Sequence, residues 1–187
     1  MTPKPRLIIP DTDVIVHLHE LGIWDAFITH YSVHVPKYIV DQEANYFTAC
    51  SVEFSKDKND ALRSTKKINL VEDIDASKIS QIDLNASDKI PLLKEANNMG
   101  AMDGLDRGEE EVLAAVFPSD SEFIACLIDR AAIRCAVLVG LKDKCISVDT
   151  ALKNCGLGRS LPVALSEMRF QKIVKQAKQE RVQKLQL

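Results

Sequence analysis

Short apolar segments alternate along this chain with segments of helical character, and this alternation limits the folds that the chain can adopt. The apolar segments are Leu7–Ile9, Ser32–Val35, Phe123–Ile128 and Cys145–Val148. Each is long enough for one strand and too short for an ordinary helix. Strands that alternate with helices form a parallel sheet with helices on both faces. We therefore predict an α/β fold, a three-layer α/β/α sandwich with a central, mostly parallel sheet.

The helices between these strands are predicted from the spacing of apolar residues and from the Gly and Pro residues that end them. They span residues 13–30 with a break near Gly22, Pro36 to about Phe47, Asp106–Phe117, Arg130–Val139 and Asp149–Asn154, and a Lys- and Gln-rich helix follows from about Pro162.

Residues 50–100 give the weakest pattern. Two strands around a polar turn at 56–60 are predicted there, followed by helices over Ala76–Leu84 and Ser87–Met99. The chain, 1–187, is interpreted as a single domain with an insertion at about 50–100 and a C-terminal helix at about 162–187.

The composition excludes several classes of protein. No apolar run approaches the roughly 20 residues that a membrane-spanning helix needs, and the N-terminal apolar stretch is too short for a signal peptide. We expect a cytoplasmic protein with no membrane association. The five cysteines form no CxxC pair and no zinc-type spacing, so we expect reduced, mostly buried thiols. The formal net charge of −3 is not typical of a nucleic-acid-binding domain, although bound metal offsets a local acidic pocket.

Two aspartates directly follow predicted strands: Asp11 comes after LIIP and Asp129 after FIACLI. The carboxyl ends of parallel strands meet at one edge of the sheet, which is where ligands bind in such folds. We therefore expect the two side chains to lie near each other. A structural alternative exists for each, because Asp11 fits a turn and Asp129 fits the N-cap of the following helix.

Two glutamates occupy helical positions where apolar residues are expected. Glu43 shares the face of the helix that carries Ile39, Val40 and Phe47. Glu109 opens the apolar face of a later helix, whose other members are Val112, Leu113 and Val116, whereas Glu110 and Glu111 are expected to face solvent. The structural alternative for Glu109 is a capping box with Asp106.

Buried carboxylates that converge repel one another, and a divalent cation relieves both the repulsion and the cost of desolvation. All-oxygen ligands suit Mg²⁺ or Mn²⁺. Such a metal lowers the pKa of bound water and stabilises a leaving oxygen, which is the chemistry of phosphodiester hydrolysis. The sequence therefore predicts Asp11, Glu43, Glu109 and Asp129 as metal ligands and catalytic residues of a nuclease.

Four segments together resemble the PIN-domain ribonucleases, and within them the VapC-like toxins of bacterial and archaeal toxin–antitoxin pairs. LIIPDTDVIV resembles the family's opening strand, which carries the first acid, and VPKYIVDQEANYF resembles the helix that carries the second. LDRGEEEVLAAV resembles the Gly-Glu-x-Glu helix that carries the third acid, and FIACLIDRAAIRCAVLVGL resembles the strand, acid and helix segment that carries the fourth. The acids correspond to Asp11, Glu43, Glu109 and Asp129, with Glu111 as a rival for the third. The segments cover most of residues 5–50 and 100–160.

The resemblance implies a PIN-like sandwich, one or two Mg²⁺ or Mn²⁺ ions, and endonucleolytic cleavage of single-stranded RNA. It also implies a homodimer and, in a toxin, an antitoxin protein as partner.

Several other residues are secondary candidates for this site. Thr12 fits either a hydrogen bond to the scissile phosphate or a turn, and Asp13 fits either a supporting role or an exposed position. Ser147 and Asp149 fit either the border of the site or a helix cap. Basic residues placed to meet phosphate are Arg130 and Arg134, and a basic band on the C-terminal helix consists of Arg169, Lys172, Lys175, Lys178, Arg181 and Lys184.

Two other functions fit the same sequence. An apolar strand followed by Asp11-Thr12-Asp13 also resembles haloacid-dehalogenase-type phosphatases, in which the first Asp is the nucleophile. That interpretation requires a later Lys and leaves Glu43 and Glu109 unexplained. The second alternative is a catalytically silent PIN-like module that binds RNA or protein.

Overall fold

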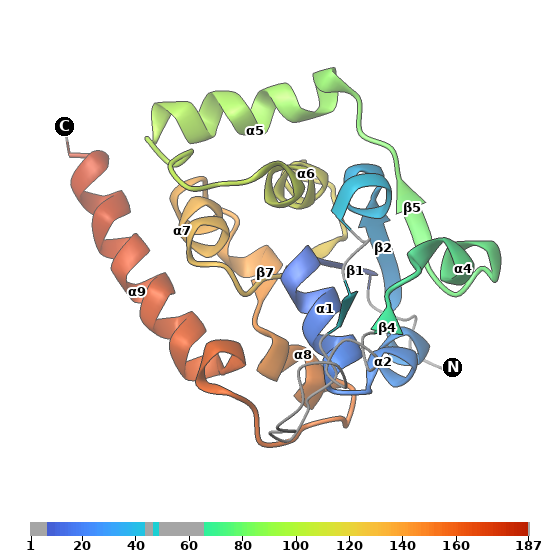
Figure 1. Ribbon diagram of the computed structural model, residues 1–187. Helices are drawn as coiled ribbons and strands as arrows, with labels where there is room; N and C mark the ends of the chain where they lie inside the picture. Colours follow the sequence, from blue (N-terminus) through green and yellow to red (C-terminus); the bar gives the residue numbers. More distant parts are fainter. Residues whose placement is uncertain (1–6, 44–46, 49–65, 187) are drawn as a thin grey trace, which may run out of the picture.

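The computed structural model describes residues 7–43, 47–48 and 66–186, and its centre is a five-stranded sheet (Figure 1). All pairings in this sheet are parallel, and the strand order is β5-β2-β1-β6-β7. The strands are β1 (Leu7–Pro10), β2 (Ser32–Pro36), β5 (Ser80–Ile82), β6 (Ile124–Cys126) and β7 (Cys145–Ile146). The predicted α/β/α sandwich around a parallel sheet is confirmed.

The order of the strands reverses at β1, which is the central strand. From β1 the chain goes first to β2 on one side and later to β6 on the other side. Ile8 and Ile9 are fully buried because helices cover both faces of β1. A crevice forms where the strand order of an open parallel sheet reverses, and ligands bind there outside the carboxyl ends of the strands. Asp11 stands at this position, directly after β1.

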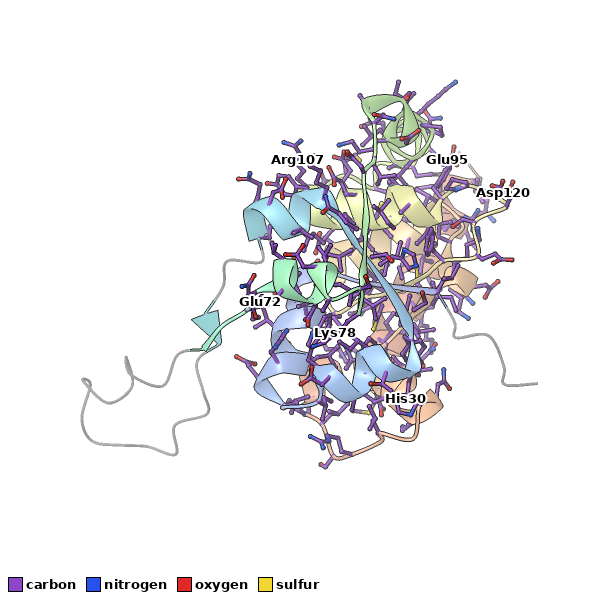
Figure 2. All side chains as sticks on the ribbon, turned by 90° about the vertical axis from the view of Figure 1, so that its right-hand side faces the viewer. His30, Glu72, Lys78, Glu95, Arg107 and Asp120 are labelled. Atoms are coloured by element: carbon purple, nitrogen blue, oxygen red, sulfur yellow. The ribbon has the colours of Figure 1, made fainter. Side chains whose placement is uncertain are left out.

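Helices form the two outer layers (Figure 1). One face of the sheet is covered by α1 (Thr12–Glu20), α2 (Trp24–His30) and α8 (Val148–Asn154), and the other by α6 (Arg107–Val116) and α7 (Arg130–Leu138). Two longer helices, α5 (Ala86–Asn98) and α9 (Glu167–Lys184), pack against α6 and α7 from outside. Figure 2, seen from the β5 edge, shows α5 outside α6 and the Arg107 side chain beside the helical turn that follows β2.

Most of the predicted elements in the second half of the chain are confirmed, with shifts of a few residues. The strands at 123–128 and 145–148 are shorter than predicted, and α9 begins at Glu167 rather than at about Pro162. The reason for the late start is a 3-10 turn at Val163–Leu165, after which Ser166 caps α9 by accepting a hydrogen bond from the Arg169 N–H.

The helix predicted over Ala76–Leu84 is wrong. The structure has α4 (Leu70–Asp75), a turn with Ser77 in the left-handed region at φ 55°, and then strand β5. Ser80 and Gln81 are exposed, and β5 is an edge strand that pairs with β2 alone. The helix predicted over Ser87–Met99 is confirmed as α5.

The helix predicted from Pro36 to about Phe47 ends earlier than predicted, and most of it is a π-helix, which is wider than an α-helix. A helical turn at 37–38 continues as a π-helix, η1 (Ile39–Glu43), and Phe47–Thr48 form strand β3, antiparallel to β4 (Lys66–Lys67). The two strands predicted around the turn at 56–60 lie largely outside the described residues.

No helix in the described part of the chain is both long and apolar enough to cross a membrane. The four cysteines described there are free thiols, and Cys126, Cys135 and Cys145 are buried, as predicted.

Helix α6 lies at the centre of its layer, so we predict that Leu113→Ala costs about 2–5 kcal/mol of unfolding free energy. Leu113 is 0% exposed on α6, between the sheet and α5. The matched control is Ile90→Ala on α5, because Ile90 is 59% exposed and its truncation leaves no cavity. Urea denaturation of both variants measures the difference, and equal losses would contradict the placement of α6.

Candidate functional site

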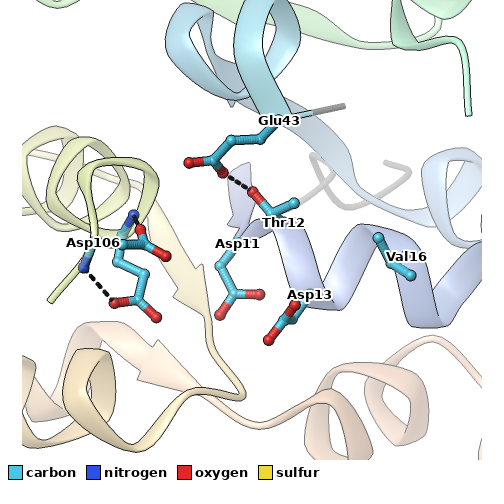
Figure 3. A pocket seen from close by; sticks show the side chains of 7 residues that line it. Asp11, Thr12, Asp13, Val16, Glu43 and Asp106 are labelled. Carbon is cyan, nitrogen blue, oxygen red and sulfur yellow. Dashed lines mark hydrogen bonds between the residues drawn. The ribbon is translucent and has the colours of Figure 1, made fainter. Parts of the chain in front are cut away.

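An acidic cavity of about 240 Å³ opens at the carboxyl end of β1. It is lined by Asp11, Thr12, Asp13, Val16, Glu43, Asp106 and Glu109 (Figure 3). Three of the four predicted site acids, Asp11, Glu43 and Glu109, therefore share one cavity although they lie far apart in the sequence. Asp13, a secondary candidate, lines it as well.

Asp11 is the innermost acid and is only 3% exposed. Its Oδ1 accepts a hydrogen bond from the Val14 N–H at 2.8 Å, and its Oδ2 accepts one from the Ile128 N–H at 3.1 Å. Burial raises the pKa of this carboxyl to about 7, because the two backbone bonds only partly offset desolvation and the charges of Asp13 and Asp129 raise it further. Asp11 is thus a helix cap and a cavity acid at once.

Glu109 and Asp106 form the capping box that the spacing indicated. The Glu109 N–H donates to Asp106 Oδ1 at 2.9 Å, and the Asp106 N–H donates to Glu109 Oε2 at 3.1 Å. Glu109 is buried, and desolvation, together with the charges of Asp106, Asp129 and Asp11, raises its pKa to about 8. Asp106 is a cavity acid that the sequence reasoning missed, because it was counted only as a cap. The capping box could have indicated this position, because it places the Asp106 side chain beside Glu109.

Glu43 reaches the cavity from η1. Its carboxylate accepts a hydrogen bond from the Thr12 hydroxyl (Figure 3). It also lies against Gly108 in the first turn of α6, where an added Cβ would collide with the Glu43 carboxylate. Desolvation raises the pKa of Glu43, and the Thr12 hydroxyl and Gly108 N–H lower it in part. Gly108 is therefore required for the close approach of η1 to α6.

Asp129 stands next to the cavity without lining it. It caps α7, with Oδ1 accepting from the N–H groups of Ala131 and Ala132, the latter at 3.3 Å. Its charge nevertheless raises the pKa of both Asp11 and Glu109, so it lies within electrostatic reach of the cavity.

Glu111 does not face solvent, contrary to the prediction. It is 5% exposed and pairs with Lys89 Nζ at 3.1 Å and with Arg107 Nε at 3.9 Å. It lines a different pocket from Glu109, together with these two cations. Of the two rivals for the third acid, Glu109 is the one that faces the cavity.

Three other secondary candidates, Ser147, Asp149 and Arg134, have structural partners. Ser147 caps α8 by accepting from the Thr150 N–H and also donates to Glu167, and Asp149 pairs with Lys153 Nζ at 3.0 Å. Arg134 pairs with Glu180 Oε1 at 2.6 Å, so it is not directed at the cavity.

The donor set of the cavity suits a hard divalent cation, because it consists of carboxylates and one hydroxyl. Among the described residues, no three Asp, Glu, His or Cys side chains are arranged to hold one ion as they stand. The hydrogen bonds explain this: Glu109 is turned to the Asp106 N–H and Glu43 to the Thr12 hydroxyl. The chemistry of the residues fits a metal, although Glu109 and Glu43 are engaged in these hydrogen bonds.

Searches against protein-family models, curated proteins and solved structures find no match for this chain. Its function is therefore inferred from the geometry of the cavity and from the resemblance of the four sequence segments.

We predict that Gly108→Ala displaces the Glu43 carboxylate while the fold is retained. The three atoms nearest to the added Cβ all belong to the flexible end of Glu43, and Ala is favoured over Gly inside a helix by about 1 kcal/mol. Once displaced into solvent, Glu43 loses the desolvation that raises its pKa. NMR titration of its side-chain carboxyl carbon, assigned with Glu43→Gln, should show a pKa closer to the ordinary value. An unchanged pKa would contradict the contact.

We also predict that the metal-free protein loses stability as the pH rises from about 4 to 8. The pKa values of Asp11 and Glu109 are about 7 and about 8 in the folded state, above their values in an unfolded chain. The folded state therefore binds more protons in this window, and its stability falls as these are released.

Urea denaturation in EDTA at pH 5 and pH 8 tests this prediction. The wild type should lose at least ~1.4 kcal/mol more than the Asp11→Asn/Glu109→Gln double variant, the equivalent of one pKa unit. The same pH dependence in both proteins would show that the two carboxyls are not buried as described.

Proposed function

We propose that this protein is a Mg²⁺- or Mn²⁺-dependent endoribonuclease that hydrolyses RNA phosphodiester bonds in the acidic cavity. The observation that carries the proposal is the convergence of Asp11, Glu43 and Glu109, from three separate segments, at the carboxyl end of the central parallel strand. Buried carboxylates gathered in this way are costly unless a cation neutralises them. The resemblance to PIN-domain nucleases independently selects the same three residues and Asp129.

Asp11 is the proposed anchor of the metal, because its side chain is fixed by two backbone N–H groups at the base of the cavity. Glu43, Glu109 and Asp129 would complete the coordination, directly or through water. When bound, the metal supplies an activated water and charge stabilisation for the leaving oxygen. If Glu43 turned to a metal, the Thr12 hydroxyl that now donates to it would become free to donate to a phosphate oxygen of the substrate.

A phosphatase of the haloacid-dehalogenase type is the alternative enzyme. Asp11 and Asp13 both line the cavity, as a nucleophile and a general acid would. No Lys lines the described part of the cavity, however, and the resemblance would leave Glu43 and Glu109 without a role. Trapping of a phosphoenzyme on Asp11 would favour this alternative.

The biological setting follows from the resemblance alone. We propose a cytoplasmic enzyme, the toxin of a toxin–antitoxin pair, that forms a homodimer and is held inactive by an antitoxin protein. Growth arrest on expression, relieved by the product of a neighbouring small gene, tests the toxin role separately from the nuclease activity. A catalytically silent module that only binds RNA or protein is the outcome if no cleavage is found.

The decisive measurement is cleavage of single-stranded RNA with Mn²⁺ or Mg²⁺. We expect cleavage to stop in EDTA and Asp11→Asn to lower the rate by more than about 10–100-fold, the loss typical of residues that only support metal ligands. The control is Asp75→Asn, which removes the same charge at an exposed position on α4 and should leave the rate unchanged. Cleavage that survives EDTA, or equal rates in both variants, would end the nuclease proposal.

A further inference from the structure

A groove between the start of α7 and the first half of α9 carries positive charge, although the protein as a whole is acidic. Three of the residues that line it are the cations Arg130, Arg169 and Lys172, and its described lining includes no acid. The volume of the groove is about 630 Å³, within the range of pockets that hold a drug-sized ligand. We call it the cationic groove.

Two of its cations are available to a ligand. Arg130 and Lys172 are exposed, and neither makes a salt bridge or a side-chain hydrogen bond within the described residues. Arg134, one turn after Arg130, is instead held by Glu180. The third cation, Arg169, has a structural role, because its Nη1 donates to Ile128 O at 2.7 Å and to Ala164 O at 3.1 Å.

The groove and the acidic cavity share one short segment of chain. The Ile128 N–H holds Asp11 in the cavity, and the Ile128 carbonyl accepts from Arg169 in the groove. Asp129, whose charge reaches Asp11 and Glu109, is followed directly by Arg130. A polymer with its reacting phosphate in the cavity could therefore continue past this segment into the groove.

The groove also presents apolar surface to solvent. Val163 and Met168 are 69% and 72% exposed, and the side chain of Ile173 lines the groove beside them. Single strands of nucleic acid offer both an anionic backbone and flat base faces, and proteins bind them in cationic grooves in which side chains pack against the bases. An Arg guanidinium can stack on a base as well as pair with phosphate.

We propose that the cationic groove binds the single-stranded RNA that flanks the scissile phosphate, with Arg130 and Lys172 on phosphates and Met168 against a base. This inference rests on the proposed nuclease function and names the part of the protein that holds the substrate. Single-stranded RNA fits better than an acidic peptide, because the segment from Ile128 to Arg130 both fixes Asp11 in the cavity and borders the groove, and the reaction proposed for the cavity takes place on a phosphate.

Binding is measured without cleavage. The full chain is titrated in EDTA with a short, unstructured, fluorescein-labelled RNA, and fluorescence anisotropy gives the Kd. The test variant is Arg130→Gln/Lys172→Gln. Its control is Lys175→Gln/Lys178→Gln, which removes the same charge from exposed positions of α9 that do not line the groove. Circular dichroism checks that both variants are folded.

The expected effect follows from counterion release. For single strands log K falls with log salt by about 0.7 per phosphate contact, which at ~0.1 M salt corresponds to roughly fivefold in affinity per contact. Loss of two contacts should weaken binding roughly 25-fold and lower the salt slope by about 1.4, whereas the control should change the Kd by no more than about twofold. Met168→Ser should weaken binding without changing the salt slope.

Equal Kd values for the test and control variants would overturn the proposal. A groove variant that binds RNA normally but loses affinity for an acidic peptide would also overturn it, in favour of a protein partner. The result is separable from the nuclease test. Weakened RNA binding by Arg130→Gln/Lys172→Gln without any metal-dependent cleavage by the wild type would support RNA binding in the groove and refute the nuclease proposal. Metal-dependent cleavage by the wild type with normal RNA binding by this variant would support the nuclease proposal and refute RNA binding in the groove.

Discussion

The burial of the Asp11 carboxylate at the end of β1 is the constraint on which the site depends. One of its oxygens is held by Val14 in the first turn of α1 and the other by Ile128 after β6. The Ile128 bond joins the end of β1 to the end of its neighbour β6, at the strand where the order reverses. The two bonds to Asp11 also fix its carboxylate where desolvation raises the pKa to about 7. The charged form of this side chain would be more stable in water than at this buried position. Under the proposed function, a bound cation would offset this cost.

The same side chains serve the fold and the site, so the two interpretations of each acid are not exclusive. Asp11 caps α1, and Asp106 and Glu109 cap α6, yet all three line one cavity. Helix N-termini suit this double use, because their free N–H groups and positive dipole ends stabilise carboxylates. The acids are thereby tolerated before any cation is present. Gly108 extends the arrangement, since its missing side chain lets Glu43 reach the same helix end.

Features of the fold and the site that depend on residues close together in the sequence could be predicted, whereas features that depend on contacts between distant segments could not. The strand ending at Asp11 and the Asp106–Glu109 capping box are local patterns, and the structure has both. Strand β5 was missed because it forms by pairing with β2, more than forty residues earlier in the chain, and no local pattern indicates that pairing. Glu111 was placed in solvent because nothing near it in sequence indicates that Lys89 of α5 lies beside it. The close approach of Glu43 likewise depends on a contact between distant segments.

Under the proposed function, the contrast between the acidic cavity and the cationic groove would explain how a protein of negative overall charge binds RNA. A net charge of −3 argues against binding a polyanion, and the acidic cavity alone would repel one. Fields are local at physiological salt, where charges more than about 8 Å apart are largely screened. Under the proposed function, the groove supplies attraction that does not require metal, while the cavity accepts a phosphate only after a cation has neutralised its acids. Substrate affinity and metal dependence would then reside in adjacent parts of the molecule, joined through Ile128, and removing the metal should abolish cleavage while leaving most of the affinity that the groove supplies.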